Sequence, residues 1–443
     1  MQAAGDKRQE PRCKQKNSFL PAVSKIIQHL DLTREFWVAY SGGVDSHVLL
    51  HSLVQLRAQH PTLAITAIHV NHGLSLNAGR WEVHCREVCA DLSVVFRSEK
   101  INLPQEEIKK QGLEAVARKL RYQAFADLLP INAYLFTAHH ANDQAETVLL
   151  QLFRGCGVNG LAGIAAQAPF AQGWLVRPLL NVSRQDLVHY ATRHQLQWIE
   201  DESNLAVKIK RNYVRHQLLP AVAKHWPGVM KTLTQAAANA ADASELLDVV
   251  AEQDWTEVAG EVAATLSVSK LLQLSAVRQR NVLRFWLKQL NLPVPNSLKL
   301  AHIQRDVLHC RVDAMPVVCW LGAEMRRYLD NLYAFAPLAP WDSTLEFTWD
   351  LKSDLILPSL GKLQVQNAKN AAPVTVRFRR GGEKLRPRGR QETHRLSKLF
   401  QEWKVPPWQR DRIPLLFRDD QLLAVVGYCA AANWEKDVVM ILN

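Results

Sequence analysis

The sequence predicts an α/β protein with an N-terminal doubly wound parallel sheet, then a helical middle domain, then a small α+β C-terminal domain. Up to about residue 222, short apolar runs typical of buried strands alternate with amphipathic helical patterns. Residues 228–290 are rich in Ala and poor in Gly and Pro, which favours helices. Strand-like alternation and glycine turns return towards the C-terminus. The 443 residues suffice for two or three domains.

The first strand is expected at residues 36–40, and a glycine turn follows it directly. A helix then carries apolar residues from about His47 to Leu56. Adjacent glycines permit positive φ and close backbone approach, so consecutive N–H groups can face an anion. The N-terminus of the following helix adds N–H groups and partial positive charge. The residues predicted to bind phosphates are Ser41, Gly42, Gly43, Val44, Asp45 and Ser46.

Asp45 is the unusual member of this turn, because a carboxylate normally repels bound phosphates. Its presence is explained if it holds a divalent cation that bridges to them. The alternative is a plain strand-to-helix turn, with Gly for geometry and Ser or Asp as the helix cap. A Walker A loop is excluded, since the chain contains no G-x-x-x-x-G-K-[ST] motif.

Strands and helices continue to alternate beyond this turn. Strands are expected at residues 63–70, 93–96 and 134–137, and helices at residues 22–30, 81–92, 112–129 and 139–154. This spacing implies a parallel sheet. Such sheets bind ligands beyond the carboxyl ends of their strands, where the glycine turn lies.

The helix at residues 112–129 is expected to bury an apolar face and to expose a charged one. Its apolar positions at helical spacing are Leu113, Val116, Ala117, Leu120, Ala124 and Leu128. Arg118 lies on the other face, together with Arg121, where a solvated salt-bridge surface is the ordinary interpretation. The functional hypothesis is that Arg118 reaches a phosphate, for which a bidentate guanidinium is well suited.

A second informative stretch holds His139, Asp143 and Glu146, which lie at i, i+4 and i+7 and are predicted to share one stripe of a helix. Charged stripes usually face solvent. This one begins at the end of a strand in the same sheet as the glycine turn, which favours a place in the active site. The glycine-rich loop at residues 154–160 is suited to moving over a substrate.

Domain boundaries follow from changes in composition. The predicted segments are a disordered basic arm at residues 1–17, a domain with the parallel sheet and the phosphate-binding turn at 18–222, a helical domain at 223–335, a linker at 336–355 and a C-terminal α+β domain at 356–443. The linker is placed where Pro337, Pro340 and Trp341 gather. The helical domain and the C-terminal domain are both expected to bind RNA.

The C-terminal domain carries a large part of the net charge of +12. Residues 374–410 contain eleven Lys or Arg against three Glu, interleaved with Phe378, Trp403 and Trp408. A charge run is usually a solvated face, but the interleaved aromatic residues favour a surface that follows an RNA backbone. The residues assigned to that surface are Arg377, Arg379, Lys384, Arg386, Arg388 and Arg390.

The cysteines and the apolar runs indicate the compartment. Seven cysteines are an odd number, and no C-x-x-C pair occurs among them. This pattern suggests neither a disulfide framework nor a zinc site. The N-terminus has no apolar signal segment, and no apolar run approaches the length of a membrane span. The sequence therefore predicts a cytoplasmic protein without a membrane partner.

Several of these motifs resemble those of one family. The turn at residues 41–46 is similar to the pyrophosphate loop of the PP-loop ATP pyrophosphatases, which split ATP into AMP and pyrophosphate. The C-terminal motifs together with residues 139–147 resemble tRNA(Ile)-lysidine synthetase specifically, and the likeness covers nearly the whole chain after residue 17. The matching segments are residues 41–46, 69–74, 112–122, 139–147, 201–204, 211–215, 377–386 and 399–408.

The resemblance implies an ATP- and Mg²⁺-dependent bacterial ligase. Its relatives attach free L-lysine to C2 of the cytidine at the first anticodon position of tRNA-Ile bearing CAU, which changes codon and amino-acid identity from Met to Ile. ATP would first adenylate the base, with Mg²⁺ on Asp45 and charge from Arg118 stabilising the departing pyrophosphate. Lysine would then displace AMP.

The resemblance also assigns roles to the second stretch. Asp143 and Glu146 become candidates for holding and deprotonating the lysine ε-amine, and His139 for a substrate or phosphate contact. Arg211 and Arg215 are assigned to RNA binding.

Two other functions are consistent with parts of the sequence. One is another PP-loop enzyme, such as a tRNA thiolase or an amide-forming ligase, although thiolases of this kind generally use paired cysteines. The other is a non-catalytic tRNA-binding protein with a degenerate turn, against which Asp45, Arg118, Asp143 and Glu146 occur together. Pyrophosphate release that depends jointly on tRNA and free lysine separates all three.

Overall fold

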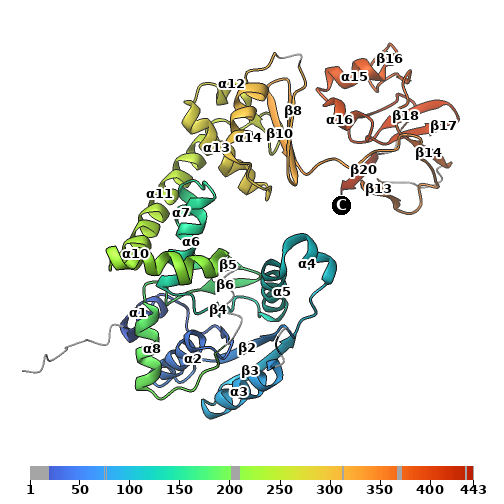
Figure 1. Cartoon of the computed structure of the whole chain (residues 1–443). Coiled ribbons are helices and arrows are strands. Elements are labelled where there is room, and N and C mark those ends of the chain that lie inside the picture. The colour runs from blue at the N-terminus through green and yellow to red at the C-terminus, as the bar shows by residue number, and fades with distance from the viewer. Residues whose placement is uncertain are drawn as a thin grey trace, which may run out of the picture. The chain divides into compact units, whose positions relative to one another are not determined.

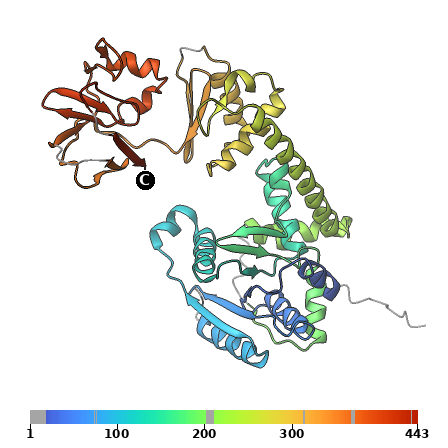
Figure 2. The same ribbon diagram turned by 180° about the vertical axis from the view of Figure 1, so that it is seen from behind.

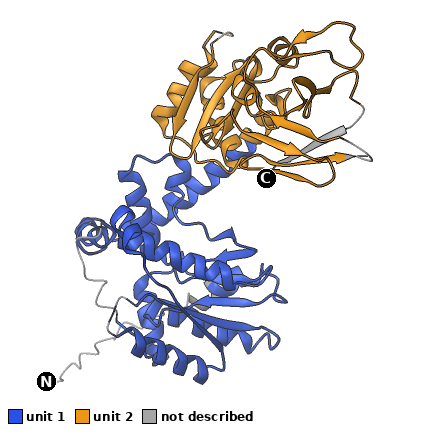
Figure 3. Ribbon diagram, turned by 90° about the vertical axis from the view of Figure 1, so that its right-hand side faces the viewer, with its two compact units in different colours: residues 1–249 blue, residues 250–443 orange. Residues whose placement is uncertain are grey.

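The computed structural model describes residues 19–73, 75, 77–200, 210–311, 314–366, 372–434 and 437–442 (Figure 1). The basic arm expected at residues 1–17 and the motif at 201–204 lie outside the described residues. The chain divides into two compact units, residues 1–249 and 250–443 (Figure 3). Among the described residues, no helix is both long and apolar enough to cross a membrane.

A six-stranded sheet forms the centre of the first unit, in the order β3-β2-β1-β4-β6-β5. All neighbouring strands are parallel except β5 and β6, which form an antiparallel hairpin. The chain order reverses between β1 and β4, which is the switch point where such sheets bind ligands. The predicted doubly wound sheet is thus confirmed. Its strands are β1 (Phe36–Ala39), β2 (Ile65–Asn71), β3 (Val95–Lys100), β4 (Tyr134–Phe136), β5 (Gln167–Phe170) and β6 (Gly173–Val176).

The five helices predicted from the sequence in this unit are present to within a few residues. The structure also has a helix at Gln105–Gln111 that was not predicted, and a short helix at Val158–Leu161 lies partly in the stretch expected to be a glycine-rich loop. The helices are α1 (Phe19–Ile27), α2 (Val44–Arg57), α3 (Ala78–Asp91), α4 (Gln105–Gln111), α5 (Leu113–Leu128), α6 (Ala141–Phe153), α7 (Val158–Leu161), α8 (Arg184–Arg193), α9 (Lys210–Tyr213) and α10 (Leu219–His225). A π-helical turn, Val214–Leu218, joins α9 to α10.

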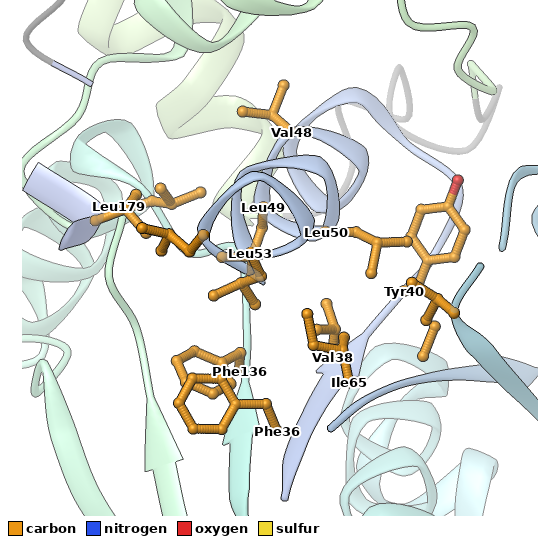
Figure 4. Close-up of a cluster of buried hydrophobic side chains, with 14 of the residues drawn as sticks. Phe36, Val38, Tyr40, Val48, Leu49, Leu50, Leu53, Ile65, Phe136 and Leu179 are labelled. Carbon is orange, nitrogen blue, oxygen red and sulfur yellow. The ribbon is translucent and has the colours of Figure 1, made fainter. Parts of the chain in front are cut away.

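Strand β1 is buried on both faces, as expected for a central parallel strand. Phe36 and Val38 belong to the core cluster that includes Leu49 and Leu53 of α2 (Figure 4). The side chain of Trp37 points to the opposite face of the sheet and packs in a separate cluster with residues of α5 and β4. The alternation along β1 therefore fixes α2 on one face of the sheet and α5 on the other, with the glycine turn at the end of the strand.

The predicted apolar face of α5 is only partly correct. Val116 and Ala124 are buried, and Phe125 joins them. Leu113 and Leu128, at the two ends of the helix, are exposed instead. Helical spacing locates one face of a helix, but the sheet covers only its central turns.

The middle of the chain is helical and also contains a sheet that was not predicted. Its strands pair in the antiparallel order β7-β10-β9-β8 around a core that includes Trp286 and Leu332. The elements are α11 (Val229–Glu257), β7 (Leu266–Ser267), α12 (Val268–Leu271), α13 (Ala276–Gln289), α14 (Ser297–His302), a π-helical turn (Ile303–Leu308), β8 (Val317–Trp320), β9 (Ala323–Tyr328) and β10 (Asn331–Phe335).

The C-terminal part combines a five-stranded, a three-stranded and a two-stranded sheet with two short helices (Figure 2). Strand β11 lies inside the stretch predicted as a linker at residues 336–355 and pairs with β14, so the sheet begins before residue 356. The elements are β11 (Glu346–Trp349), β12 (Leu355–Leu357), β13 (Gly361–Gln366), β14 (Val374–Arg377), β15 (Lys384–Leu385), β16 (His394–Arg395), α15 (Leu396–Glu402), α16 (Pro407–Arg410), β17 (Leu415–Arg418), β18 (Gln421–Val425), β19 (Cys429–Ala430) and β20 (Asp437–Leu442).

Candidate active site

The turn between β1 and α2 needs glycine at one position. Gly42 has φ +84°, and a Cβ there would lie 2.6 Å from Ile199 Cδ1 and 2.9 Å from Cys85 Sγ. Any side chain at this residue would therefore be strained and would clash. Gly43 has φ −72° as the N-cap of α2, which any residue can adopt. The positive φ that two adjacent glycines permit is therefore adopted at Gly42 and not at Gly43.

The two serines close the turn from inside. Ser46 Oγ donates to the Gly43 carbonyl at 3.0 Å and accepts from the Ser41 N–H at 3.2 Å, and the two hydroxyls lie 3.1 Å apart. Ser46 is buried, so its hydroxyl shapes the turn in this conformation. Within the described residues, no side chain caps the first turn of α2. Its backbone N–H groups can therefore serve an anion.

Asp45 presents one paired and one unpaired oxygen. Its Oδ2 lies 3.6 Å from His140 Nε2. Its Oδ1 is buried and has no hydrogen-bond partner within the described part of the chain. A buried carboxylate oxygen without a donor is costly unless a cation or a ligand satisfies it. This atom fits a ligand of a divalent cation, although no group of three or more His, Cys, Asp or Glu among the described residues forms a complete metal site.

His140 joins this turn to the second predicted stretch. It is the N-cap of α6, and its Nδ1 accepts from the Asn142 N–H while Asp143 accepts from the His140 backbone N–H at 3.1 Å. This capping requires a lone pair on Nδ1, so the proton of the neutral ring lies on Nε2, facing Asp45 and Asp143. Burial opposes a charge on His140, but the hydrogen bond to Asp45 and the charge of Asp143 together raise its pKa.

Asp143 and Glu146 are held by two arginines from the segment that follows the undescribed residues. Glu146 is fully buried and accepts from Arg211 Nε at 2.8 Å and from Arg215 Nε at 2.6 Å. Asp143 Oδ1 accepts from Arg215 at 3.0 Å and from Arg211 at 3.3 Å. We call these four residues the ionic cluster. It places the two arginines assigned to RNA binding inside the candidate active site.

The charges of the ionic cluster compensate one another. Burial alone would raise the pKa of Asp143, but His140, His139 and Arg211 outweigh it and lower that pKa. Burial alone would lower the pKa of Arg215, but its hydrogen bonds to Glu146 outweigh burial and raise that pKa. Both partners therefore stay charged at neutral pH. A carboxylate with a lowered pKa holds a cation well but accepts a proton poorly.

His139 precedes α6, which begins at Ala141, so the predicted helical stripe starts too early. Its Nδ1 lies 2.9 Å from the Thr137 hydroxyl. Burial lowers the pKa of His139 to about 3, and the charges of Arg177 and Arg118 act in the same direction. This histidine is therefore neutral near pH 7 and can contact a substrate without adding charge.

The predicted Arg118 is exposed on α5 with its guanidinium carbon 4.9 Å from the centre of the Tyr122 ring. Arg177 was missed as a site residue. It is buried at the carboxyl end of β6 and donates to the Ala165 carbonyl at 2.7 Å, and burial lowers its pKa. Its place directly after a strand of the parallel sheet is a signal that could have found it. Neither Arg118 nor Arg177 forms an ion pair with another described residue, so both add positive charge to the site.

The C-terminal arginines divide into two groups. Arg377, Arg379 and Arg390 form ion pairs with Glu346, Asp411 and Glu402, respectively. Within the described residues, the exposed side chains of Lys384, Arg386 and Arg388 make no ion pair. All six remain predictions as RNA-binding residues, and the unpaired three are the most available for phosphate contacts.

A parallel sheet with a glycine turn at its switch point, beside an unpaired aspartate oxygen, is the arrangement expected of an ATP-using protein of the PP-loop class. Residues 16–222 match the family model described as PP-loop domain. Two further models match the second unit, the TilS substrate binding domain at residues 266–333 and the TilS substrate C-terminal domain at residues 374–439.

Curated relatives identify the family. The chain is 43% identical to tRNA(Ile)-lysidine synthase of Coxiella burnetii over 420 residues, covering 93% of this chain and 92% of that protein. It is 40% identical to the protein of the same name from Alkalilimnicola ehrlichii over 412 residues, covering 90% and 91%. The chain belongs to the tRNA(Ile)-lysidine synthase family and is an ATP-dependent, tRNA-modifying ligase.

Among solved structures, the U34-tRNA thiolase NcsA from Methanococcus maripaludis is similar over 50% of this chain and 77% of that chain, with a TM-score of 0.42 and 17% identity.

Proposed function

We propose that this protein joins the ε-amine of free lysine to C2 of the cytidine at the first anticodon position of tRNA-Ile bearing CAU. The base is first adenylated by ATP, which releases pyrophosphate, and lysine then displaces AMP. The observation that carries the proposal is the convergence of the glycine turn, Asp45 and the ionic cluster at one edge of the sheet, in a chain related over most of its length to tRNA(Ile)-lysidine synthases.

The glycine turn and its surroundings would serve the adenylation step. The uncapped N-terminus of α2 offers N–H groups to the pyrophosphate, and Gly42 lets the backbone come close. Mg²⁺, held by the unpaired Oδ1 of Asp45, would supply charge neutralisation at the phosphates when bound. Arg118 and Arg177 add positive charge on the side of His139, where an anion can be stabilised without a further cation.

The ionic cluster would serve the lysine step by holding the ammonium group. Because Asp143 and Glu146 are already occupied by two guanidinium groups, lysine must displace or share at least one arginine contact. Arg211 and Arg215 keep the carboxylates charged until lysine arrives, which prevents an isolated buried anion. The lowered pKa of Asp143 favours holding the ammonium over deprotonating it. Of the two roles predicted for Asp143 and Glu146, we therefore retain holding of the ε-amine and not its deprotonation.

The test supplies the full-length protein with ATP, labelled lysine and total tRNA. We expect label in one tRNA species, in cytidine at the first anticodon position, together with stoichiometric release of pyrophosphate. Omission of lysine should prevent product formation, and sustained pyrophosphate release should require both tRNA and lysine. Label on another nucleotide, or pyrophosphate release that is indifferent to tRNA, would contradict the proposal and favour another PP-loop ligase.

A further inference from the structure

A groove of about 420 Å³ lies beside the ionic cluster and takes part in none of the steps above. Its walls come from the C-terminal end of α6 and from α9 with the π-helical turn. The lining residues are Leu150, Phe153, Arg154, Lys210, Tyr213, Val214 and Leu218. The size is within the usual range for a small-ligand site.

The groove continues the surface that carries the catalytic carboxylates. On α6, Leu150 and Phe153 follow Asp143 and Glu146 by seven residues each, which is two helical turns on the same side of the helix. Two turns correspond to about 10 Å. The opposite wall comes from the segment that carries the two arginines of the ionic cluster, because Lys210 directly precedes Arg211 and Val214 directly precedes Arg215. A chain threaded through the active site would therefore reach the groove next.

The chemistry of the groove is that of a binding site for single-stranded nucleic acid. Phe153 is 64% exposed and Tyr213 54% exposed, although both are large aromatic side chains. Arg154 and Lys210 are exposed and form no ion pair within the described part of the chain. Exposed aromatic rings that stack on bases, beside cations that meet the backbone, are the features by which proteins bind unpaired nucleotides.

We propose that this groove binds a nucleotide flanking the reactive cytidine in the anticodon loop. Its base stacks on Phe153 and Tyr213, and its phosphate meets Arg154 and Lys210. A cytidine drawn into the active site loses its stacking on its neighbours, and the groove replaces that stacking for one of them. The inference rests on the proposed function, because it requires the cytidine to enter beside the ionic cluster.

The first test measures affinity for an anticodon stem-loop RNA without ATP or lysine. Combined Phe153→Ala and Tyr213→Ala substitution should weaken binding by about 5- to 150-fold, the range typical of a lost base stack. The matched control is Ile131→Ala, which removes an exposed apolar side chain just before β4, at the other end of the sheet. This control should bind like the wild type.

Abasic RNAs then identify the occupant. An abasic site on one flank of the cytidine should cost the wild type as much as the double substitution does, and should cost the doubly substituted protein nothing more. Full affinity of the double variant, or losses that simply add, would overturn the groove assignment. Failure of the wild type to bind the stem-loop would overturn the proposed function as well, which distinguishes the two failures.

The cations supply an independent readout. Arg154→Gln with Lys210→Gln should flatten the dependence of log affinity on log salt by about 1.4 units, at roughly 0.7 per contact to a single strand. Lys25→Gln on α1, which neutralises an exposed lysine outside the groove, should leave the slope unchanged. An unchanged slope in the double variant would remove the phosphate contact from the proposal.

Discussion

Two pairs of arginines in this chain carry the same charge in opposite surroundings. Arg211 and Arg215 face two buried carboxylates and are themselves mostly buried. Arg386 and Arg388 are exposed, and their side chains form no ion pair among the described residues. Both pairs were assigned to RNA from the sequence. The difference shows that the partners supplied by the fold decide whether an arginine is available to a phosphate.

The two surroundings also differ in what a lost charge costs. Removing one member of a buried ion pair leaves an uncompensated charge and destabilises a protein by about 3–5 kcal/mol. An exposed charge contributes less than about 1 kcal/mol to stability. Measuring both stability and RNA affinity on the same variants therefore separates the two kinds of arginine.

The largest effect is expected at Asp45, the site carboxylate that forms no ion pair with an arginine among the described residues. Asp45→Asn should lower the rate of ATP-dependent pyrophosphate release by several orders of magnitude, with each tenfold loss equal to about 1.4 kcal/mol of barrier. The fold and tRNA affinity should persist, because Oδ1 has no hydrogen bond to lose. Near-normal release by this variant would remove Asp45 from the mechanism.

The next effect concerns stability. Arg215→Ala should destabilise the catalytic unit by about 3–5 kcal/mol, because among the described residues buried Glu146 then keeps only Arg211 as an ion-pair partner. The urea midpoint of the full chain measures this, with Arg386→Ala as the matched control. Adding Glu146→Gln should restore part of the loss, since the uncompensated charge is then gone. Equal urea midpoints for Arg215→Ala and Arg386→Ala would show that the buried and the exposed arginine contribute equally to stability, which would contradict this expectation.

Much of the site could be predicted because it depends on local patterns. The turn at residues 41–46 is contiguous, and the strand-helix alternation places it at the carboxyl edge of the sheet. His139, Asp143 and Glu146 follow a strand of the same sheet, so their approach to the turn follows from topology. The structure agrees with this expectation, because His140 Nε2 lies 3.6 Å from Asp45 Oδ2 of the turn.

The ionic cluster could not be predicted in the same way. Arg211 and Arg215 lie 65 to 72 residues beyond the carboxylates they bind, and the chain between them crosses several elements. Two arginines at i, i+4 fit an RNA surface and a buried ion pair equally well. Only the packing of α9 and the π-helical turn against α6 distinguishes the two. The predicted burial of Leu113 and Leu128, at the two ends of α5, was wrong for a related reason. Helical periodicity locates the apolar face of a helix but does not show how far along the helix the neighbouring sheet extends.

A buried group that forms no ion pair in the described structure should make the stability of the protein depend on pH. His51 is buried against Tyr190 and His194, and burial lowers its pKa to about 4. The unfolded chain binds a proton near pH 6.5, whereas the folded one does not, so stability should fall as pH drops from about 6.5 to 4. One such group contributes a slope of up to about 1.4 kcal/mol per pH unit.

Urea unfolding across this pH range checks that expectation with His51→Gln, which should show a shallower loss than the wild type. The control is His60→Gln, because His60 is exposed. The two variants following the same curve as the wild type would show that His51 is not the titrating group.

The smallest effect on stability, and the clearest one on RNA, belongs to the C-terminal arginines. Arg386→Gln with Arg388→Gln should leave the urea midpoint unchanged, since neither side chain has an ion pair to lose in the described structure. Each phosphate contact contributes a slope of about 0.9 to the dependence of log affinity on log salt. Loss of two contacts should therefore flatten the slope for tRNA by about 1.8 units. Arg390→Gln should flatten the slope by less than Arg386→Gln or Arg388→Gln does. Arg390 is held by Glu402 at 2.8 Å and must leave that carboxylate to meet a phosphate. A larger change from Arg390 than from Arg386 would mean that exposure and pairing do not govern which cations bind RNA here.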